Sequence, residues 1–272
     1  MGEKQIYNRF KSRLGEYCSV CQFIELTTKC FDSNYSSILQ NTCDFWALCS
    51  ENGVSLASND LEKAVTHVPQ TYILIIHTCF EEFLQNLYQE LKKTSLNSFS
   101  EKKDGESYLE CVYKNVRTKN RPKTIDVSFQ LCEYYRLVRN YIVHQNINIK
   151  TVKAKYKAVS DLYASISTKR YGKLHAPNLP QKLSFDDFIF FSKSCLEIST
   201  YLHESLKLDY FKILKTASNK TLYKWKNQTE ERRRISIQKY IQHYYRLDSS
   251  FQEDFPALEM FVAEFDPSKK ST

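Results

Sequence analysis

The sequence predicts an all-α fold, and three observations carry that prediction. Apolar residues recur at intervals of three and four along most of the chain, as on helices that pack one stripe against a core. Five glycines and six prolines in 272 residues are too few for the many tight turns of a β-rich protein. A chain of this length can also bury a sizeable core, as one large domain or as a domain with an appendage.

The first third of the chain is expected to form helices separated by turn-forming residues. Residues 4–29 carry an inner apolar stripe, and the polar residues 32–34 separate them from a second helix over 35–49. Pro69 is expected to break or kink the following segment. The most hydrophobic helix then runs over 71–93.

The middle of the chain alternates loops with amphipathic helices. Residues 94–105 are polar and are expected to form a mobile loop, followed by a short helix over 107–117. The central helix is predicted to start near Thr124, with that residue as its cap. Further helices are predicted over 150–167 and over 184–206, the latter with acidic residues in its first turn.

The last part of the chain is rich in tyrosine, lysine and arginine. Residues 210–245 interleave basic and aromatic side chains, a composition that can grip single-stranded nucleic acid. An ordinary pair of amphipathic helices explains the same pattern and is the interpretation we favour. Residues 251–265 are acidic and aromatic, and are a candidate docking strip for that basic pair.

Positive charge is concentrated in one stretch of the sequence. The chain has a formal charge of +8, and residues 112–176 hold fourteen Lys and Arg against three acids. The excess of eleven leaves the remainder of the chain at 8 − 11 = −3. This distribution would draw a polyanion toward the middle of the chain, although solvated loop lysines are the simpler explanation for some of it. The candidate RNA-binding residues are Lys119, Arg121, Lys123, Lys150 and Lys153.

We expect a cytoplasmic protein without a metal site. No apolar run is long enough to cross a bilayer, and the first residues lack an apolar signal region. The nine cysteines fall mostly within apolar helical patterns, so we expect free thiols that pack as small hydrophobic groups. Cys18 and Cys21 have metal-like spacing, but no second such pair follows, and packing is the favoured explanation.

The stretch most suggestive of chemistry is Arg136 to Gln145, near the end of the central helix. Arg136, Asn140 and His144 are four residues apart and share one stripe of a helix. Arg139 and His144 are five apart, so they diverge by roughly 140° and rise about 7.5 Å. The two side chains could converge if the helix frays at its end, or if a second copy of the helix faces the first. Residues 145–148 are poor helix formers, which places the helix end here.

An arginine followed by asparagine, three further residues and histidine, at the end of a long amphipathic helix, resembles the motif of the HEPN superfamily. Those proteins are small helical bundles, many of them metal-independent ribonucleases of toxin–antitoxin, abortive-infection and CRISPR-associated systems. The matching positions are Arg139, Asn140 and His144. Residues 80–84 are similar to the preceding family helix, which often carries an acidic residue, and residues 183–188 are similar to the start of the last bundle helix.

The resemblance covers roughly residues 60–206 and implies an architecture. We expect an HEPN-like antiparallel helical bundle with extra N- and C-terminal helices. The bundle domain is expected over residues 1–208, with its core at about 60–206, and a helical extension over 209–272.

The resemblance also implies a reaction. If His144 accepts the proton of a ribose 2′-OH, that oxygen can attack the adjacent phosphorus and leave a 2′,3′-cyclic phosphate and a 5′-OH end without a metal ion. Arg139 would stabilise the charge on the phosphoryl oxygens, which its planar fork suits better than lysine would. Asn140 would orient the imidazole or hold a phosphate oxygen. Glu81 and Arg136 are the supporting candidates.

The partners follow from the same resemblance. HEPN ribonucleases usually place two motif helices side by side, so we expect a homodimer with Arg139 and His144 at or near its interface. The expected substrate is RNA, with tRNA as one candidate, and an antitoxin or sensor protein is a candidate regulator. No cofactor is expected.

Two other functional classes remain open from the sequence. An inactive helical binding or assembly module could keep the motif for structure, with His144 capping its own helix end. A DNA-binding regulator is supported only by the basic residues 210–245.

Overall fold

A computed structural model describes most of the chain and confirms the all-α prediction. The regular elements of the described residues are all helical, apart from an isolated bridge between Ser95 and Leu208. None of the helices that these residues form combines the length and the apolar run that a bilayer crossing needs. The described residues are 1–39, 42–54, 61–95, 99–116, 118, 121–144, 148–164, 174–247 and 249–265.

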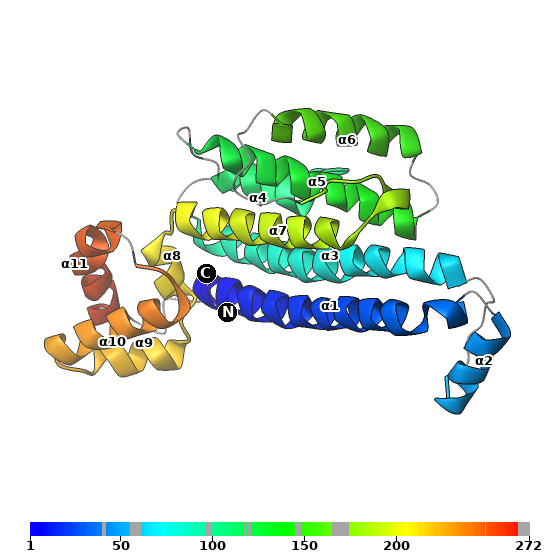
Figure 1. The fold of residues 1–272 in the computed structure, drawn as a ribbon. Coiled ribbons are helices and arrows are strands. Elements are labelled where there is room, and N and C mark those ends of the chain that lie inside the picture. The colour runs from blue at the N-terminus through cyan, green and yellow to red at the C-terminus, as the bar shows by residue number, and fades with distance from the viewer. Residues whose placement is uncertain are drawn as a thin grey trace. The chain divides into compact units, whose positions relative to one another are not determined.

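Figure 1 shows the helices of the described residues along the chain. The first seven are α1 (Glu3–Leu39), α2 (Thr42–Glu51), α3 (Leu61–Thr94), α4 (Tyr108–Val116), α5 (Lys123–Val143), α6 (Ile149–Ala164) and α7 (Phe185–Ser205), with a short 3-10 turn, η1 (Pro180–Lys182), before α7. The last four are α8 (Tyr210–Lys215), α9 (Asn219–Lys226), α10 (Glu230–Tyr244) and α11 (Ser249–Ala263).

The chain forms two compact units whose residues interleave along the sequence. The first unit contains residues 1–11, 81–121 and 199–272, and the second contains 12–80 and 122–198. Helices α1, α3 and α7 contribute residues to both units. The domain boundary predicted at residue 208 stays a prediction.

Two predicted helix breaks are absent from the structure. α1 continues through residues 32–34 to Leu39, and α3 continues through Pro69. Proline removes one backbone N–H donor from a helix. In α3 that loss is confined to one position, and the turns that follow bury Tyr72, Ile73 and Ile76 completely. Burial of an apolar face therefore outweighs the local preference for a break.

The second unit is built around the buried face of α5. Leu131, Tyr134, Tyr135 and Val138 recur at helical spacing along α5, and each has no solvent exposure. α5 packs side by side with α6 (Figure 1). Lys155 of α6 donates a hydrogen bond to the side-chain oxygen of Gln130 on α5. The predicted cap at Thr124 is wrong, because the residue before the first turn is Pro122 and it makes no side-chain cap.

A buried carboxylate joins α5 to the start of α7. Asp187 is fully buried and accepts hydrogen bonds from the Tyr135 hydroxyl at 2.9 Å, the Asn178 backbone N–H at 2.8 Å and the Ser184 backbone N–H at 2.9 Å. The bond from Ser184 is the capping arrangement predicted for this helix. Because every donor is satisfied by one anion, the carboxylate fixes α5 against the loop that precedes α7.

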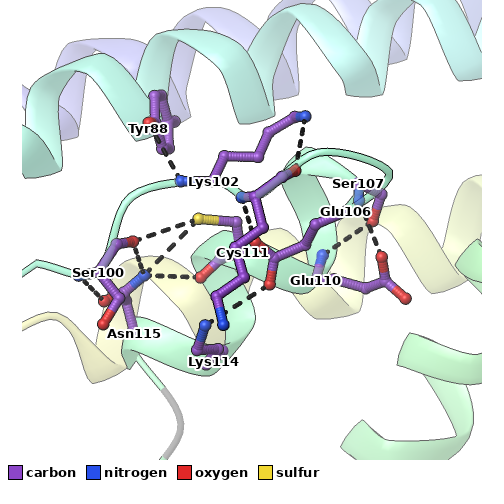
Figure 2. A network of polar contacts seen from close by, with 10 residues as sticks. Tyr88, Ser100, Lys102, Glu106, Ser107, Glu110, Cys111, Lys114 and Asn115 are labelled. Atoms are coloured by element: carbon purple, nitrogen blue, oxygen red, sulfur yellow. Dashed lines mark hydrogen bonds and ion pairs between the residues drawn. The ribbon is translucent and has the colours of Figure 1, made fainter.

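In the first unit, the described part of the loop before α4 is held in place rather than free (Figure 2). The Asn115 amide oxygen accepts from the Ser100 N–H at 2.8 Å, and the Asn115 amide nitrogen donates to the Ser100 carbonyl at 3.0 Å. The Lys102 N–H donates to the Tyr88 hydroxyl at 3.3 Å. These contacts hold residues 100 and 102 to α4 and α3, and the mobility expected for this loop stays a prediction.

The same network starts α4 with a reciprocal cap that the sequence analysis overlooked (Figure 2). The Ser107 hydroxyl accepts from the Glu110 N–H at 3.0 Å, while the Glu110 carboxylate accepts from the Ser107 N–H at 2.8 Å. Serine followed three residues later by glutamate is the sequence pattern of this cap, so the signal was present. The cap sets where α4 begins, one residue later than predicted.

Three short helices, α8, α9 and α10, replace the predicted pair over 210–245. Two of them begin at side-chain caps: Asp209 accepts from the Lys212 N–H, and Ser218 accepts from the Thr221 N–H. The predicted docking of residues 251–265 is confirmed, because α11 packs against α9 and α10 within this unit.

Candidate active site at the end of the motif helix

The motif helix α5 stops one residue before the histidine. Val143 is its last residue, and His144 follows with an extended backbone at φ −117° and ψ 112°. The His144 N–H still donates to the Asn140 carbonyl at 2.8 Å, so the last turn is closed. The His144 side chain is exposed and no longer follows the direction that a continuing helix would give it.

This end geometry brings the two principal motif side chains together within one chain. Arg139 Nη1 lies 3.1 Å from His144 Nε2. The separation of roughly 140° holds only for a continuous helix. The extended backbone at His144 and the length of the arginine side chain remove it, so a facing second copy is not needed for the contact.

The protonation of His144 follows from the chemistry of its partner. A guanidinium can only donate hydrogen bonds, so Nε2 of His144 must accept from Arg139. The ring in this contact is therefore neutral, with its proton on Nδ1. An imidazole in this form can take up a proton at Nε2 once Arg139 moves to another acceptor.

Asn140 contacts Arg139 rather than the imidazole. Its side-chain oxygen accepts from Arg139 Nη1 at 2.9 Å, and its backbone carbonyl accepts from His144 as described above. Asn140 therefore holds the guanidinium beside His144. The expected alternatives for Asn140, orienting the imidazole or holding a phosphate oxygen, stay predictions.

The two arginines of the motif helix differ in their charge balance. Arg136 donates from Nε to the Glu133 carboxylate at 2.9 Å, and its Nη2 lies 2.8 Å from the same oxygen. Glu133 is buried, so this pair is well shielded from water. Among the described residues no carboxylate pairs with Arg139, which is half-buried and contacts only neutral groups. The positive charge of Arg139 thus remains available to an anion.

A second histidine of the same unit lies in the field of both arginines. His77 of α3 is 8 % exposed, and burial lowers its pKa to about 4, with further lowering by the charges of Arg139 and Arg136. His77 is therefore neutral at physiological pH. The sequence analysis did not include His77 among the site residues, because a histidine on an apolar helix is more often a packing residue.

The remaining predicted site residues are not brought to the motif by any described contact. Glu81 is half-buried and belongs to the first compact unit, whereas the motif belongs to the second, so its participation stays a prediction. Arg121, also in the first unit, lies over the ring of Tyr113 at 5.9 Å. Lys119 lies outside the described residues.

Three of the predicted RNA-binding lysines belong to the same unit as the motif. Lys123, Lys150 and Lys153 are exposed. Lys150 and Lys153 lie in the first turns of α6, which begins five residues after His144. Their ammonium groups could bind phosphates, and among the described residues no hydrogen-bond or ion-pair partner is found for them.

Two arginines of the α10 run are bonded to backbone carbonyls and a carboxylate of the same unit. Arg233 donates to the backbone carbonyls of Trp225 at 3.3 Å, Lys226 at 3.4 Å and Gln228 at 3.1 Å. It thereby satisfies carbonyls at the end of α9. Arg234 lies 3.5 Å from the Glu259 carboxylate. These contacts favour the ordinary helical interpretation of residues 210–245 over a nucleic-acid grip.

Most of the cysteines whose side chains are described pack as buried groups. Free thiols are found at Cys18, Cys21, Cys30, Cys49, Cys79, Cys111, Cys132 and Cys195, of which Cys30 is exposed and Cys18 is half-buried. Burial raises the pKa of Cys18, Cys21 and Cys195. Across the same residues, no cluster of three or more His, Cys, Asp or Glu side chains is arranged to hold a metal ion.

Comparison with known proteins found no match to the chain. No family model matches the chain, and neither a curated protein nor a solved structure is significantly similar to it.

Proposed function

We propose that the protein is a metal-independent endoribonuclease of the HEPN type. The observation that carries this proposal is the contact of Arg139 Nη1 with His144 Nε2 at 3.1 Å, at an exposed helix end. The pair joins a base, whose lone pair becomes available once Arg139 turns to a phosphate, to a cation that has no carboxylate partner among the described residues. Those are the two groups that attack by a 2′-OH on its neighbouring phosphate requires.

In the proposed reaction, an RNA phosphate draws Arg139 away from the imidazole. His144 Nε2 then accepts the 2′-OH proton, the 2′ oxygen forms a bond to phosphorus, and the bond from phosphorus to the 5′ oxygen breaks. The 5′ oxygen takes a proton from water and leaves as a hydroxyl, His144 returns its proton to the solvent, and the other fragment ends in a 2′,3′-cyclic phosphate. Arg139 stabilises the phosphoryl oxygens during this step, while Asn140 keeps the guanidinium at the site.

A direct assay tests this proposal. Purified protein is incubated with total tRNA in EDTA, and the new RNA ends are mapped for wild type and for His144→Ala. Wild type is expected to cut RNA without a divalent ion, and the variant is expected to lose that activity. If both proteins treat the RNA identically, the chain is better described as a helical binding module.

We further propose that two copies associate through the motif end of α5. Val143 supports this, because its apolar side chain is 45 % exposed directly beside His144. Light scattering on the purified protein tests the oligomeric state, with Val143→Asp as the interface variant. A dimer that Val143→Asp dissociates fits the proposal, and a wild-type monomer that still cleaves RNA contradicts it.

The biological role proposed with this activity is that of a cytoplasmic toxin or phage-defence effector restrained by an antitoxin or sensor protein. A free ribonuclease site at an exposed helix end would damage cellular RNA, so it calls for control. Expression of wild type is expected to arrest growth and His144→Ala is not. Equal growth of the two strains at equal protein levels contradicts the proposed toxicity.

A further inference from the structure

The outer face of α6 carries three exposed lysines in one stripe. Lys150, Lys153 and Lys157 are separated by three and four residues, so they lie one above the other along the helix. All three are exposed, whereas Val152 and Val159 on the opposite face are buried. Because α6 packs against α5, the lysine stripe lies on the side of α6 that faces solvent.

The fourth lysine of α6 has a different position and a structural contact. Lys155 is half-buried and donates to the side-chain oxygen of Gln130 on α5. It lies five residues from Lys150, which places it about 140° around the helix from that residue. Lys155 therefore holds α6 against α5, whereas the lysine stripe projects away from this contact.

The charge distribution within α6 favours an anionic partner over a purely structural role for the stripe. α6 has no acid in its first turn, and the single acid of its sequence, Asp161, comes one turn after Lys157. The start of a helix carries partial positive charge, so a cation such as Lys150 is slightly unfavourable there. The stripe thus gathers three positive charges within about 10 Å of helix, which a bound polyanion would compensate.

The chain itself keeps the lysine stripe near the motif end of α5. Lys150 follows His144 by six residues in the same compact unit, which limits the distance between their Cα atoms to about 22 Å. A stacked nucleic-acid strand, with one phosphate per about 3.4 Å of its axis, covers that distance in about six nucleotides. A strand bound at His144 can therefore continue onto the stripe, whereas a single nucleotide cannot reach both.

We propose that the lysine stripe of α6 binds the backbone phosphates of an RNA strand whose scissile linkage lies at Arg139 and His144. The inference rests on the proposed ribonuclease function and names its substrate class, an extended RNA strand rather than a mononucleotide or dinucleotide. Ammonium groups bind phosphates as point charges, and phosphate contacts carry no sequence information, so this binding is independent of base sequence. A lipid surface fits the stripe less well, because the apolar face of α6 is buried in the protein.

The salt dependence of RNA binding tests this inference without reference to cleavage. The probe is a labelled oligouridine of about 20 nucleotides with 2′-O-methyl groups, which has no 2′-OH to attack the phosphate. Each phosphate that a lysine neutralises contributes about 0.7 to the slope of log K against log salt for a single strand. The triple variant Lys150→Gln, Lys153→Gln, Lys157→Gln is therefore expected to lower the slope by about two and to weaken binding about a hundredfold at about 0.1 M salt.

A matched control removes the same net charge at another place. Lys220, Lys224 and Lys239 are exposed on α9 and α10 of the first unit, and their triple glutamine variant should bind the probe with nearly the wild-type slope and affinity. Circular dichroism checks that both variants are folded. Equal binding by the two variants would mean that the net charge of the protein, and not the stripe, attracts RNA, and it overturns the inference. A wild-type protein that does not bind the probe overturns it as well.

The two proposals fail separately. If the α6 variant loses probe binding but the wild-type protein cuts no RNA, the RNA-binding stripe stands and the ribonuclease proposal falls. If the wild-type protein cuts RNA but the α6 variant binds the probe as tightly as wild type, the ribonuclease proposal stands and the lysine stripe is only a solvated face.

Discussion

Two arginine-rich regions of the chain, the end of α5 and residues 232–234 of α10, use the same side chain in different ways. In α10, Arg233 closes the end of α9 through three backbone carbonyls, and Arg234 is paired with Glu259 and lies over Phe255. In α5, Arg139 is held by an amide and an imidazole, both neutral. A guanidinium held by neutral groups keeps its charge for an incoming anion, whereas one that closes its own fold is structural.

The same contrast occurs within one helix. Arg136 and Arg139 are three residues apart on α5, but the buried Glu133 compensates only Arg136. From the sequence alone, the two arginines would be equally good candidates for a catalytic cation. Their partners separate a structural ion pair from a candidate catalytic cation.

The largest expected effect belongs to His144. His144→Ala should reduce RNA cleavage by about a thousandfold, because it removes the general base. The unfolding free energy should change little, since the side chain is exposed. His175→Ala is the matched control, an exposed histidine of the same unit outside the motif, and it should cleave RNA at the wild-type rate. Equal rates for the two variants would remove the motif end of α5 from the chemistry.

Lysine variants of Arg139 and Arg232 test the comparison of the two basic regions. Arg139→Lys keeps the charge but loses the planar fork, so cleavage should fall about a hundredfold. Arg232→Lys, in the exposed part of the α10 run, should leave the cleavage rate unchanged. Single-turnover kinetics measures both. A larger loss at Arg232 than at Arg139 would reverse the assignment of the two regions.

The pKa of His77, which is lowered by burial and further by the charges of Arg139 and Arg136, should be visible in the pH dependence of stability. The unfolded chain protonates His77 near pH 6.5, but the native state does so only near pH 4. Between these values the unfolded state binds more protons, so the unfolding free energy falls as the pH is lowered from 6.5 to 4. The full loss is about 3 kcal/mol, and it is absent above pH 6.5.

Urea unfolding of wild type and His77→Phe at several pH values measures this contribution. The stability difference between the two proteins should change across the window from pH 6.5 to 4 and stay constant above it. A difference that does not vary with pH would contradict the burial of His77 as a neutral ring.

The smallest expected effects belong to α10 and concern stability alone. Arg233→Ala should lower the unfolding free energy by about 2 kcal/mol, because it removes the donor to the partly buried carbonyls of Lys226 and Gln228. Arg234→Ala should cost less than about 1 kcal/mol, since that side chain is 55 % exposed. Thermal unfolding and an RNA cleavage assay test both variants. Reduced cleavage by folded Arg233→Ala would give α10 a functional role.

The fold was predictable where a long apolar period decided the structure. The buried stripe of α5 is an example, and the reciprocal cap of Ser107 and Glu110 could have been read from its spacing. Residues 32–34 and Pro69 favour a break locally, but α1 and α3 continue through them, and in α3 the residues after Pro69 are buried. Local preference and tertiary burial compete, and only the first can be judged from neighbouring residues.

The candidate site was predictable in identity but not in geometry. The sequence named Arg139, Asn140 and His144, and the poor helix formers after His144 indicated a helix end. The contact at 3.1 Å depends on an extended backbone at a single residue. The roles of Arg233 and Arg234 depend on the partners that they have. None of these follows from residue type or spacing.

The most direct test of the account replaces the nucleophile in the substrate. Once the cleavage site in an RNA is mapped, a synthetic RNA is made with a single 2′-deoxyribose on the 5′ side of that linkage. The account predicts that wild-type protein in EDTA no longer cuts this linkage, while the matched all-ribose RNA yields a 2′,3′-cyclic phosphate. Cleavage that persists at the deoxy linkage would contradict it.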